Sequence, residues 1–247
     1  MTRETSTLQW LEPGMPMPPA HTALSSPSSL RGLVAAGHEL TPQRLQEAYA
    51  QGIFPWFTEG QPVLWWSPDP RMVLRTAEFR LHDSLRKTLR QWQRQARLEV
   101  RLDSAFGRVI RHCAQAPRAG QHGTWIVPEM IEAYEALHAQ GLVHSVETWL
   151  DGELVGGLYA VSMGCAIFGE SMFALRSDAS KVALAALVAF ARVHDMPWID
   201  CQQNTRHLAS LGAREMARAD FLLGVHREVQ RPAPVWEFRS IYWDALC

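Results

Sequence analysis

The chain has 247 residues, 47% hydrophobic and 20% charged, with a formal net charge of -1. This length and composition suit one globular domain with an accessory piece, and they exclude wholesale disorder. The near-zero charge excludes a globally basic nucleic-acid-binding protein, although a local basic patch remains open.

The 4 cysteines are widely spaced and form no CxxC pair. We therefore expect reduced thiols, a cytoplasmic location and no metal site. No apolar stretch approaches the roughly 20 residues of a membrane span, so we expect no membrane association.

The N-terminal part of the chain predicts little regular structure. Residues 1–30 are rich in Pro and Ser and predict an extended arm. Residues 41–52 predict a helix, with Thr41 as the capping residue and Gly52 at its end. The segment 53–71 contains four prolines and predicts an irregular join in which Trp65 and Trp66 are packed.

A basic helix is expected after this join, at residues 84–97. Its helical period gathers cationic side chains on one face: Arg86, Arg90, Arg94 and Arg97, with Lys87 beside them. Such a face is usually a solvated surface. A strand at 98–103 and a helix at 128–141 follow.

The C-terminal half predicts a meander followed by a buried helix. Three antiparallel strands are expected at residues 144–150, 153–162 and 165–173. Residues 178–196 predict a long buried helix capped by Asp178 or Ser180. It leads into a strand at 197–202 and a short helix at 206–213.

This order of elements predicts an α/β (α+β) fold with a mostly antiparallel mixed sheet. We expect a small N-terminal domain at residues 31–70, after the arm, and a larger domain at residues 71–247. Nothing in the chain repeats.

The strand at 197–202 carries an acid and an amide two positions apart. Alternation places Asp200 and Gln202 on one face and turns Cys201 to the other. The carboxylate can orient the amide, whose oxygen can accept a hydrogen bond from an attacking amine. The alternative is a polar pair that completes the end of a strand. Cys201 is expected as a small buried apolar residue rather than a nucleophile paired with His207.

Eight sequence blocks within residues 52–213 together resemble one enzyme family, the leucyl/phenylalanyl-tRNA-protein transferases. In chain order these blocks are "GIFPWF", "LWWSPDPR", "GTWI", "LVGGLYAV", "FGESMF", "DASKVAL", "IDCQ" and "HLASLGA". The resemblance implies a bacterial cytosolic enzyme that moves Leu, Phe or, less efficiently, Met from aminoacyl-tRNA onto a protein N-terminus. The acceptor begins with Arg or Lys, and the product enters N-end rule degradation.

The resemblance also implies a larger domain with the GNAT-like acyltransferase fold. The glycine-rich loop with which GNAT enzymes hold coenzyme A is absent, and "ESMFALRSDAS" stands in its place. Because an aminoacyl ester is already activated, we expect no cofactor, ATP or metal.

The resemblance assigns roles to individual residues. Gln202 is expected to hydrogen-bond the attacking amine, with Asp200 as its orienter or as a base. Trp56 and Trp125 are expected to hold the terminal adenosine or the aminoacyl group by stacking. Glu170 is expected to bind the cationic acceptor residue, and its alternative is a cap on the following turn.

The donor side chain needs an apolar pocket. Our candidates, each equally compatible with plain core, are Leu158, Ile167, Leu184, Leu187 and Ile199. The basic helix face would hold tRNA phosphates without reading sequence. Two other functions fit the pattern: a GNAT-like enzyme that acylates a cell-wall peptide or small amine, and a tRNA-binding module without chemistry.

Overall fold

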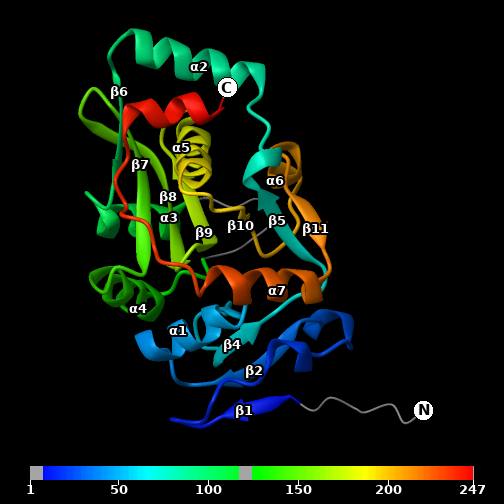
Figure 1. Cartoon of the computed structure of the whole chain (residues 1–247). Helices are drawn as coiled ribbons and strands as arrows, with labels where there is room; N and C mark the ends of the chain where they lie inside the picture. Colours follow the sequence, from blue (N-terminus) through cyan, green and yellow to red (C-terminus); the bar gives the residue numbers. More distant parts are fainter. Residues whose placement is uncertain (1–7, 117–123, 247) are drawn as a thin grey trace.

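The computed structural model describes residues 8–116 and 124–246, which form two sheets with helices around them. A four-stranded sheet lies at one end of the molecule, and a seven-stranded sheet forms the larger part (Figure 1). This confirms the mixed α/β class with a small N-terminal region. No helix of the described ranges is long and apolar enough to cross a membrane.

The four-stranded sheet has the order β1-β2-β4-β3. Its strands are β1 (Gln9–Leu11), β2 (Leu33–Gly37), β3 (Phe54–Pro55) and β4 (Val63–Trp66). Residues 8–30, expected as an extended arm, therefore supply an edge strand that pairs in parallel with β2, and they bury Met17 and Leu24. Residues 1–7 of that expectation lie outside the described part.

Helix α1 (Pro42–Ala50) follows β2 and confirms the predicted start. The Thr41 hydroxyl accepts the backbone N–H of Arg44 at 3.2 Å, and proline occupies the first turn. Gly52 follows in the left-handed conformation that ends the helix without strain.

The seven-stranded sheet has the order β11-β5-β10-β9-β8-β7-β6. Its strands are β5 (Arg71–Arg75), β6 (Leu98–Leu102), β7 (Val143–Leu150), β8 (Glu153–Met163), β9 (Ala166–Ala174), β10 (Trp198–Asp200) and β11 (Arg214–Met216). All neighbours are antiparallel except β9 and β10, which run in parallel. The predicted meander is thereby confirmed as β7, β8 and β9.

Helices cover both faces of this sheet. Helix α5 (Ala179–Val193) packs on β7 to β9 in one core with Leu158 and Ile167. Helices α3 (Phe106–Gln115) and α4 (Pro128–Ala139) pack in another core with Tyr159 and Phe168. Since neighbouring strand residues point to opposite faces, the two cores lie on opposite sides of the sheet.

The remaining helices surround α5 and the sheet edge. They are α2 (Asp83–Arg94), α6 (Arg206–Ser210), α7 (Arg218–Glu228) and the 3-10 helix η4 (Ser240–Leu246), which packs on α5. The helix expected to reach residue 97 ends at Arg94, because Ala96 adopts a φ of 52° that an α-helix cannot contain.

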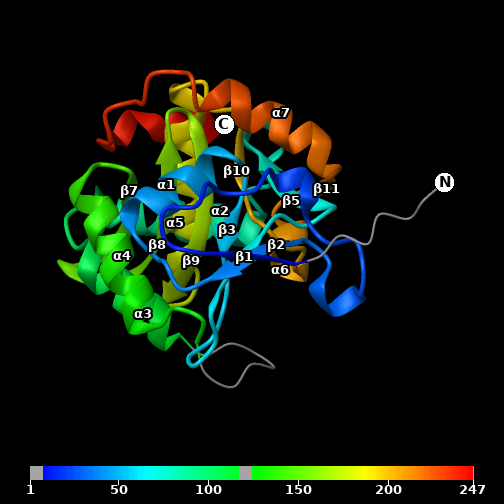
Figure 2. The ribbon, with the colours of Figure 1, turned by 90° about the horizontal axis from the view of Figure 1, so that it is seen from below.

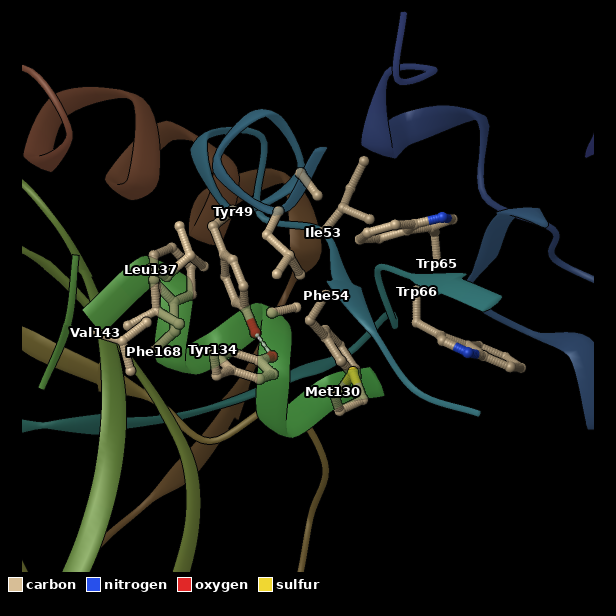
Figure 3. Close-up of a cluster of buried hydrophobic side chains, with 14 of the residues drawn as sticks. Tyr49, Ile53, Phe54, Trp65, Trp66, Met130, Tyr134, Leu137, Val143 and Phe168 are labelled. Carbon is tan, nitrogen blue, oxygen red and sulfur yellow. Dashed lines mark hydrogen bonds between the residues drawn. The ribbon is translucent and has the colours of Figure 1, made fainter. Parts of the chain in front are cut away.

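The join between the two sheets is a packed core rather than an irregular segment (Figure 3). Residues 53–71, which we expected to be irregular, form β3, β4 and the start of β5. Trp65 and Trp66 are buried here as expected, while Tyr49 of α1 meets Tyr134 of α4. Seen from below, the N-terminal sheet lies across the end of the larger domain, with α1 near α4 (Figure 2).

Candidate functional site

A pocket of about 300 Å³ opens where β9 and β10 separate. The two parallel strands pair through only two positions, Ile199 with Ile167 and Asp200 with Phe168. Beyond these pairs β9 continues to Ala174, whereas β10 stops and its chain turns away. The end of a parallel strand pair at which the chain diverges is a common place for a ligand crevice in α/β sheets.

The floor of the pocket is apolar. It is formed by four of the five residues expected to hold the donor side chain: Leu158, Leu184, Leu187 and Ile199. The fifth, Ile167, is fully buried behind them and does not line the pocket, because its place in the ladder opposite Ile199 is inside the core. Met172 of β9 completes the apolar wall.

The N-terminal sheet supplies a second, aromatic wall. Phe54 and Trp56 reach the pocket from β3 and the residue after it, and Trp125 reaches it from the segment before α4. The backbone carbonyl of Trp56 accepts the indole N–H of Trp66 at 2.8 Å, which fixes this part of the chain. Both expected aromatic residues therefore lie at the pocket, although the glycine that opens "GTWI" lies outside the described residues.

Polar side chains also line the pocket, and the exposed ones mark its mouth. The polar lining residues are Glu170 of β9, Gln202 and Gln203 after β10, and Thr205 and His207 at the start of α6. Gln203, Thr205 and His207 are exposed, whereas Gln202 is half-buried. The pocket is thus apolar at its base and polar where it meets solvent.

Glu170 combines a buried carboxylate with incomplete hydrogen bonding. Its Oε2 accepts the hydroxyl of Tyr134 at 3.3 Å, and that hydroxyl lies 2.5 Å from the hydroxyl of Tyr49. Its Oε1 is buried and has no hydrogen-bond partner among the described residues. Burial raises the pKa of Glu170 to about 8; hydrogen bonds from the two tyrosines oppose this rise, and the charge of Asp200 adds to it.

Asp200 does not line the pocket, because its carboxylate is sealed in an ion pair with Arg71. Arg71 Nε donates to Asp200 Oδ1 at 2.7 Å and Nη2 donates to Oδ2 at 2.6 Å, and both side chains are 0% exposed. Arg71 also donates to the carbonyl of Gly52 at 3.1 Å and lies between the rings of Phe54 and Phe221. The pair ties the N-terminal domain to β5, β10 and α7.

The expected strand alternation through Gln202 is wrong, because β10 ends at Asp200. Gln202 adopts a left-handed φ of 54°, which reverses the direction of its side chain. Asp200 Oδ1 accepts the backbone N–H of Gln202 at 3.0 Å rather than its side-chain amide. The Nε2 group of Gln202 is buried without a hydrogen-bond partner among the described residues, which is uncommon for a buried donor.

The Cys201 side chain also lines the pocket, on the side we had assigned away from the polar pair. Burial raises the pKa of this thiol, so it has no nucleophilic thiolate at neutral pH. The described cysteines Cys113, Cys165 and Cys201 are all free, and Cys247 lies outside the described residues. Residues 8–116 and 124–246 contain no cluster of three or more His, Cys, Asp or Glu suited to a metal ion.

The basic helix face lies on α2, at the opposite end of the larger domain from the N-terminal sheet (Figure 1). The side chains of Arg86, Lys87, Arg90 and Arg94 form no ion pair with any described residue. Arg97 lies beyond α2 and forms an exposed ion pair with Asp151, which raises the pKa of the guanidinium. Arg97 therefore does not belong to the set of unpaired cationic side chains on α2.

Several site residues were missing from the sequence-based set. Tyr49 of α1 and Tyr134 of α4 contact Glu170. Arg71 of β5 forms the ion pair with Asp200, and His207 of α6 lines the mouth of the pocket. Tyr134 and Glu170 are 36 residues apart in the chain, and Arg71 and Asp200 are 129 residues apart, so sequence spacing does not reveal these contacts. The one local signal was the "HLASLGA" block, which contains His207.

Comparison with known proteins gives consistent matches along most of the chain. The family described as leucyl/phenylalanyl-tRNA protein transferase matches residues 73–226, and the N-terminal domain of the same family matches residues 38–69. A leucyl/phenylalanyl-tRNA–protein transferase of Polaromonas sp. is 56% identical over 96% of this chain and 93% of its own length. One from Burkholderia pseudomallei is 58% identical over 93% of this chain and 90% of its own length.

Solved structures match only weakly. A conserved protein of unknown function from Bacteroides thetaiotaomicron aligns with a TM-score of 0.35 at 11% identity, over 69% of this chain and 57% of its own. The C-terminal domain of a putative lysylphosphatidylglycerol synthetase from Agrobacterium fabrum aligns with a TM-score of 0.34 at 12% identity, over 86% of this chain and 70% of its own. Neither value supports an argument about fold or function.

Proposed function

Because the chain belongs to the leucyl/phenylalanyl-tRNA–protein transferase family, we propose that the pocket between β9 and β10 receives the aminoacyl end of its tRNA substrate. The chain is an aminoacyltransferase that transfers Leu or Phe from aminoacyl-tRNA to the N-terminus of a protein. The observation that supports the proposed site most directly is the combination of an apolar floor and a polar mouth.

The donor side chain would occupy the apolar floor. A volume of about 300 Å³ lies at the lower end of the range for ligand pockets and suits one amino acid with part of its nucleoside. One methylene in such a pocket changes the free energy of binding by only about 1 to 3 kcal/mol, so tolerance among Leu, Phe and, less efficiently, Met would be expected. Trp56 and Trp125 would stack with the adenosine or the aminoacyl group.

The reaction is aminolysis of an ester, in which the enzyme aligns the amine with the carbonyl carbon. Gln202 would hydrogen-bond the attacking amine through its oxygen, while its unpartnered Nε2 group would bind the ester oxygen. Asp200 would act as a positioning residue. Its contact with the Gln202 backbone and its pairing with Arg71 support this role over that of a base.

Glu170 would bind the cationic side chain of an acceptor that begins with Arg or Lys. Its buried Oε1 has no hydrogen-bond partner among the described residues, so a contact with a cationic group would complete its hydrogen bonding. An arriving cation favours the ionised carboxylate and lowers its pKa, so binding of the acceptor would release a proton near neutral pH.

The tRNA body would contact α2. Arg86, Lys87, Arg90 and Arg94 lack acidic partners among the described residues and so offer their full charge to phosphates. Such contacts do not depend on base sequence, which would let one enzyme accept several tRNAs.

The wider assignments follow the family resemblance. We propose a GNAT-like fold for the larger domain, a cytoplasmic location and a role in N-end rule degradation. The parallel β9 and β10 strands within a mostly antiparallel sheet support the proposed fold.

The decisive test is label transfer. The protein is mixed with Leu-tRNA carrying radiolabelled leucine and with peptides that begin with Arg, Lys or Asp, plus an acetylated Arg peptide as control. We expect label on the Arg and Lys peptides only. Transfer to small amines instead would support the generic acyltransferase, and tRNA retention without transfer would support a binding module.

A further inference from the structure

His207 lies at the mouth of the reaction pocket, and its side chain has no partner among the described residues. It is the second residue of α6, whose start is fixed by Thr205, since the Thr205 hydroxyl accepts the backbone N–H of Leu208 at 3.2 Å. The imidazole is exposed, lines the pocket, and forms no hydrogen bond or ion pair with a described residue.

The solvent-exposed part of the pocket wall includes this ring. If the donor side chain lies against Leu184, Leu187 and Ile199, its ester carbonyl points toward the opening, since these three side chains are buried. Gln202 and His207 both line the pocket, and His207 is exposed to solvent. An amine that attacks the ester enters from solvent into the pocket that the imidazole lines.

The other titratable groups of the pocket are poorly suited to accept a proton there. Asp200 is sealed against Arg71, and burial raises the pKa of the Cys201 thiol. Burial also raises the pKa of Glu170 to about 8, so this carboxyl is mostly protonated at neutral pH.

The surroundings of His207 favour its neutral form. Partial burial lowers its pKa, and the charge of Lys181 on α5 adds to the decrease. The nearby charged groups are Lys181 with its partner Asp178 on α5, Glu170 across the pocket, and Arg206 on the same helix. A neutral imidazole keeps one nitrogen lone pair for a proton.

We propose that His207 is a catalytic residue that accepts the proton of the attacking α-amine and returns it to the departing ribose oxygen. As the C–N bond forms, one proton moves from nitrogen to the imidazole; as the C–O bond breaks, the same proton moves to the ribose oxygen. The imidazole ends neutral, and no further reactant is needed. This inference rests on the proposed function.

The test compares His207→Gln with His226→Gln, which changes an exposed histidine of α7 outside the pocket. Single-turnover transfer of leucine is measured from pH 5 to pH 8 with the Arg peptide at saturating concentration, so that titration of Glu170 changes peptide binding and not the measured rate. Affinity for Leu-tRNA is measured separately. The amine has a pKa near 8, so the logarithm of the rate rises with a slope of about one below this pH. In the wild type the slope should become about two below the pKa of His207, because the imidazole then protonates as well.

In His207→Gln the slope should stay near one, and the rate at pH 7 should fall about 100-fold with tRNA affinity within about twofold of wild type. His226→Gln should behave as wild type. A His207→Gln protein that keeps a slope of two, loses less than about threefold in rate, or weakens tRNA binding as much as it slows transfer would overturn the inference. Absence of transfer by the wild type would instead count against the proposed function.

The wild-type profile also tests the inference without any variant. A slope of one throughout the acid range would refute the role of His207, however the variants fold. Urea unfolding of each variant checks that its midpoint matches the wild type, as expected for an exposed side chain.

Discussion

Replacing Asp200 with Asn removes one charge from a buried ion pair while nearly preserving side-chain size. In the wild type two N–H groups of Arg71 donate to this carboxylate at 2.7 and 2.6 Å, and neither side chain reaches solvent. The substitution leaves the Arg71 guanidinium buried without its counter-ion. Loss of one partner of such a pair costs about 3 to 5 kcal/mol.

This cost is large beside the whole stability of a protein, which is about 5 to 15 kcal/mol. Equilibrium urea unfolding measures it directly, and with a denaturant slope of about 3 kcal/mol per M the midpoint should fall by about 1 to 2 M. The matched control is Asp151→Asn, which removes the carboxylate of the exposed Arg97 pair. That change should leave the midpoint almost unchanged, because solvent screens an ion pair between two exposed side chains.

A double variant separates the lost charge from lost packing. Arg71→Met with Asp200→Leu removes both charges together, and it should be more stable than Asp200→Asn alone. An Asp200→Asn protein as stable as Asp151→Asn, or a double variant less stable than Asp200→Asn, would refute the reasoning that the buried charge dominates.

Three further changes test the site. The folded pKa of Glu170 is about 8 and its unfolded pKa is about 4.5, so the folded protein holds the extra proton between these values and stability falls as pH rises. Glu170→Gln lacks this titration, and between pH 6 and pH 8 it should gain about 2 to 3 kcal/mol relative to wild type in urea unfolding. Gln202→Ala should lower turnover at least about tenfold while tRNA affinity, measured by filter binding, stays within about twofold. Replacing Arg86, Arg90 and Arg94 with Ala should make the slope of log binding constant against log salt shallower by up to about 2.7.

Each of these changes has a control and an outcome that contradicts it. Glu129→Gln changes an exposed residue and should match the wild type in urea unfolding at each pH. A gain in stability similar to that of Glu170→Gln would show that the effect does not come from the Glu170 site. Equal losses of turnover and tRNA affinity in Gln202→Ala would argue against a role in the chemistry. Arg111→Ala on α3, whose guanidinium is paired with Glu135, should leave the salt slope unchanged. An unchanged slope in the triple variant would remove α2 from the tRNA interface.

The elements that could be predicted from the sequence are those with local signals. The Thr41 cap of α1, the prolines that begin α1 and α4, and the turns between β7, β8 and β9 depend on residues close in the chain. By contrast, β3, β4, β5 and β11 are short strands whose pairing depends on distant partners. The four prolines of residues 53–71 therefore suggested an irregular segment where β3, β4 and the start of β5 lie.

The candidate site likewise combines features with a local sequence signal and features that depend on distant residues. The residues expected from the sequence form part of the pocket lining, but strand alternation misplaced the relation between Asp200 and Gln202. A strand that ends at residue 200 and a glutamine in the left-handed region have no signal in residue types alone. The buried Arg71 partner, 129 positions away, could not be inferred from spacing.

The pocket draws its walls from segments of both sheets and from the helices around the larger one. Phe54 and Trp56 come from the N-terminal sheet, whereas Leu184 and Gln202 come from the larger domain. A protein without the N-terminal sheet would keep the polar groups of the pocket and lose its aromatic wall. A substitution on either side of the pocket therefore reshapes a space that the other side completes.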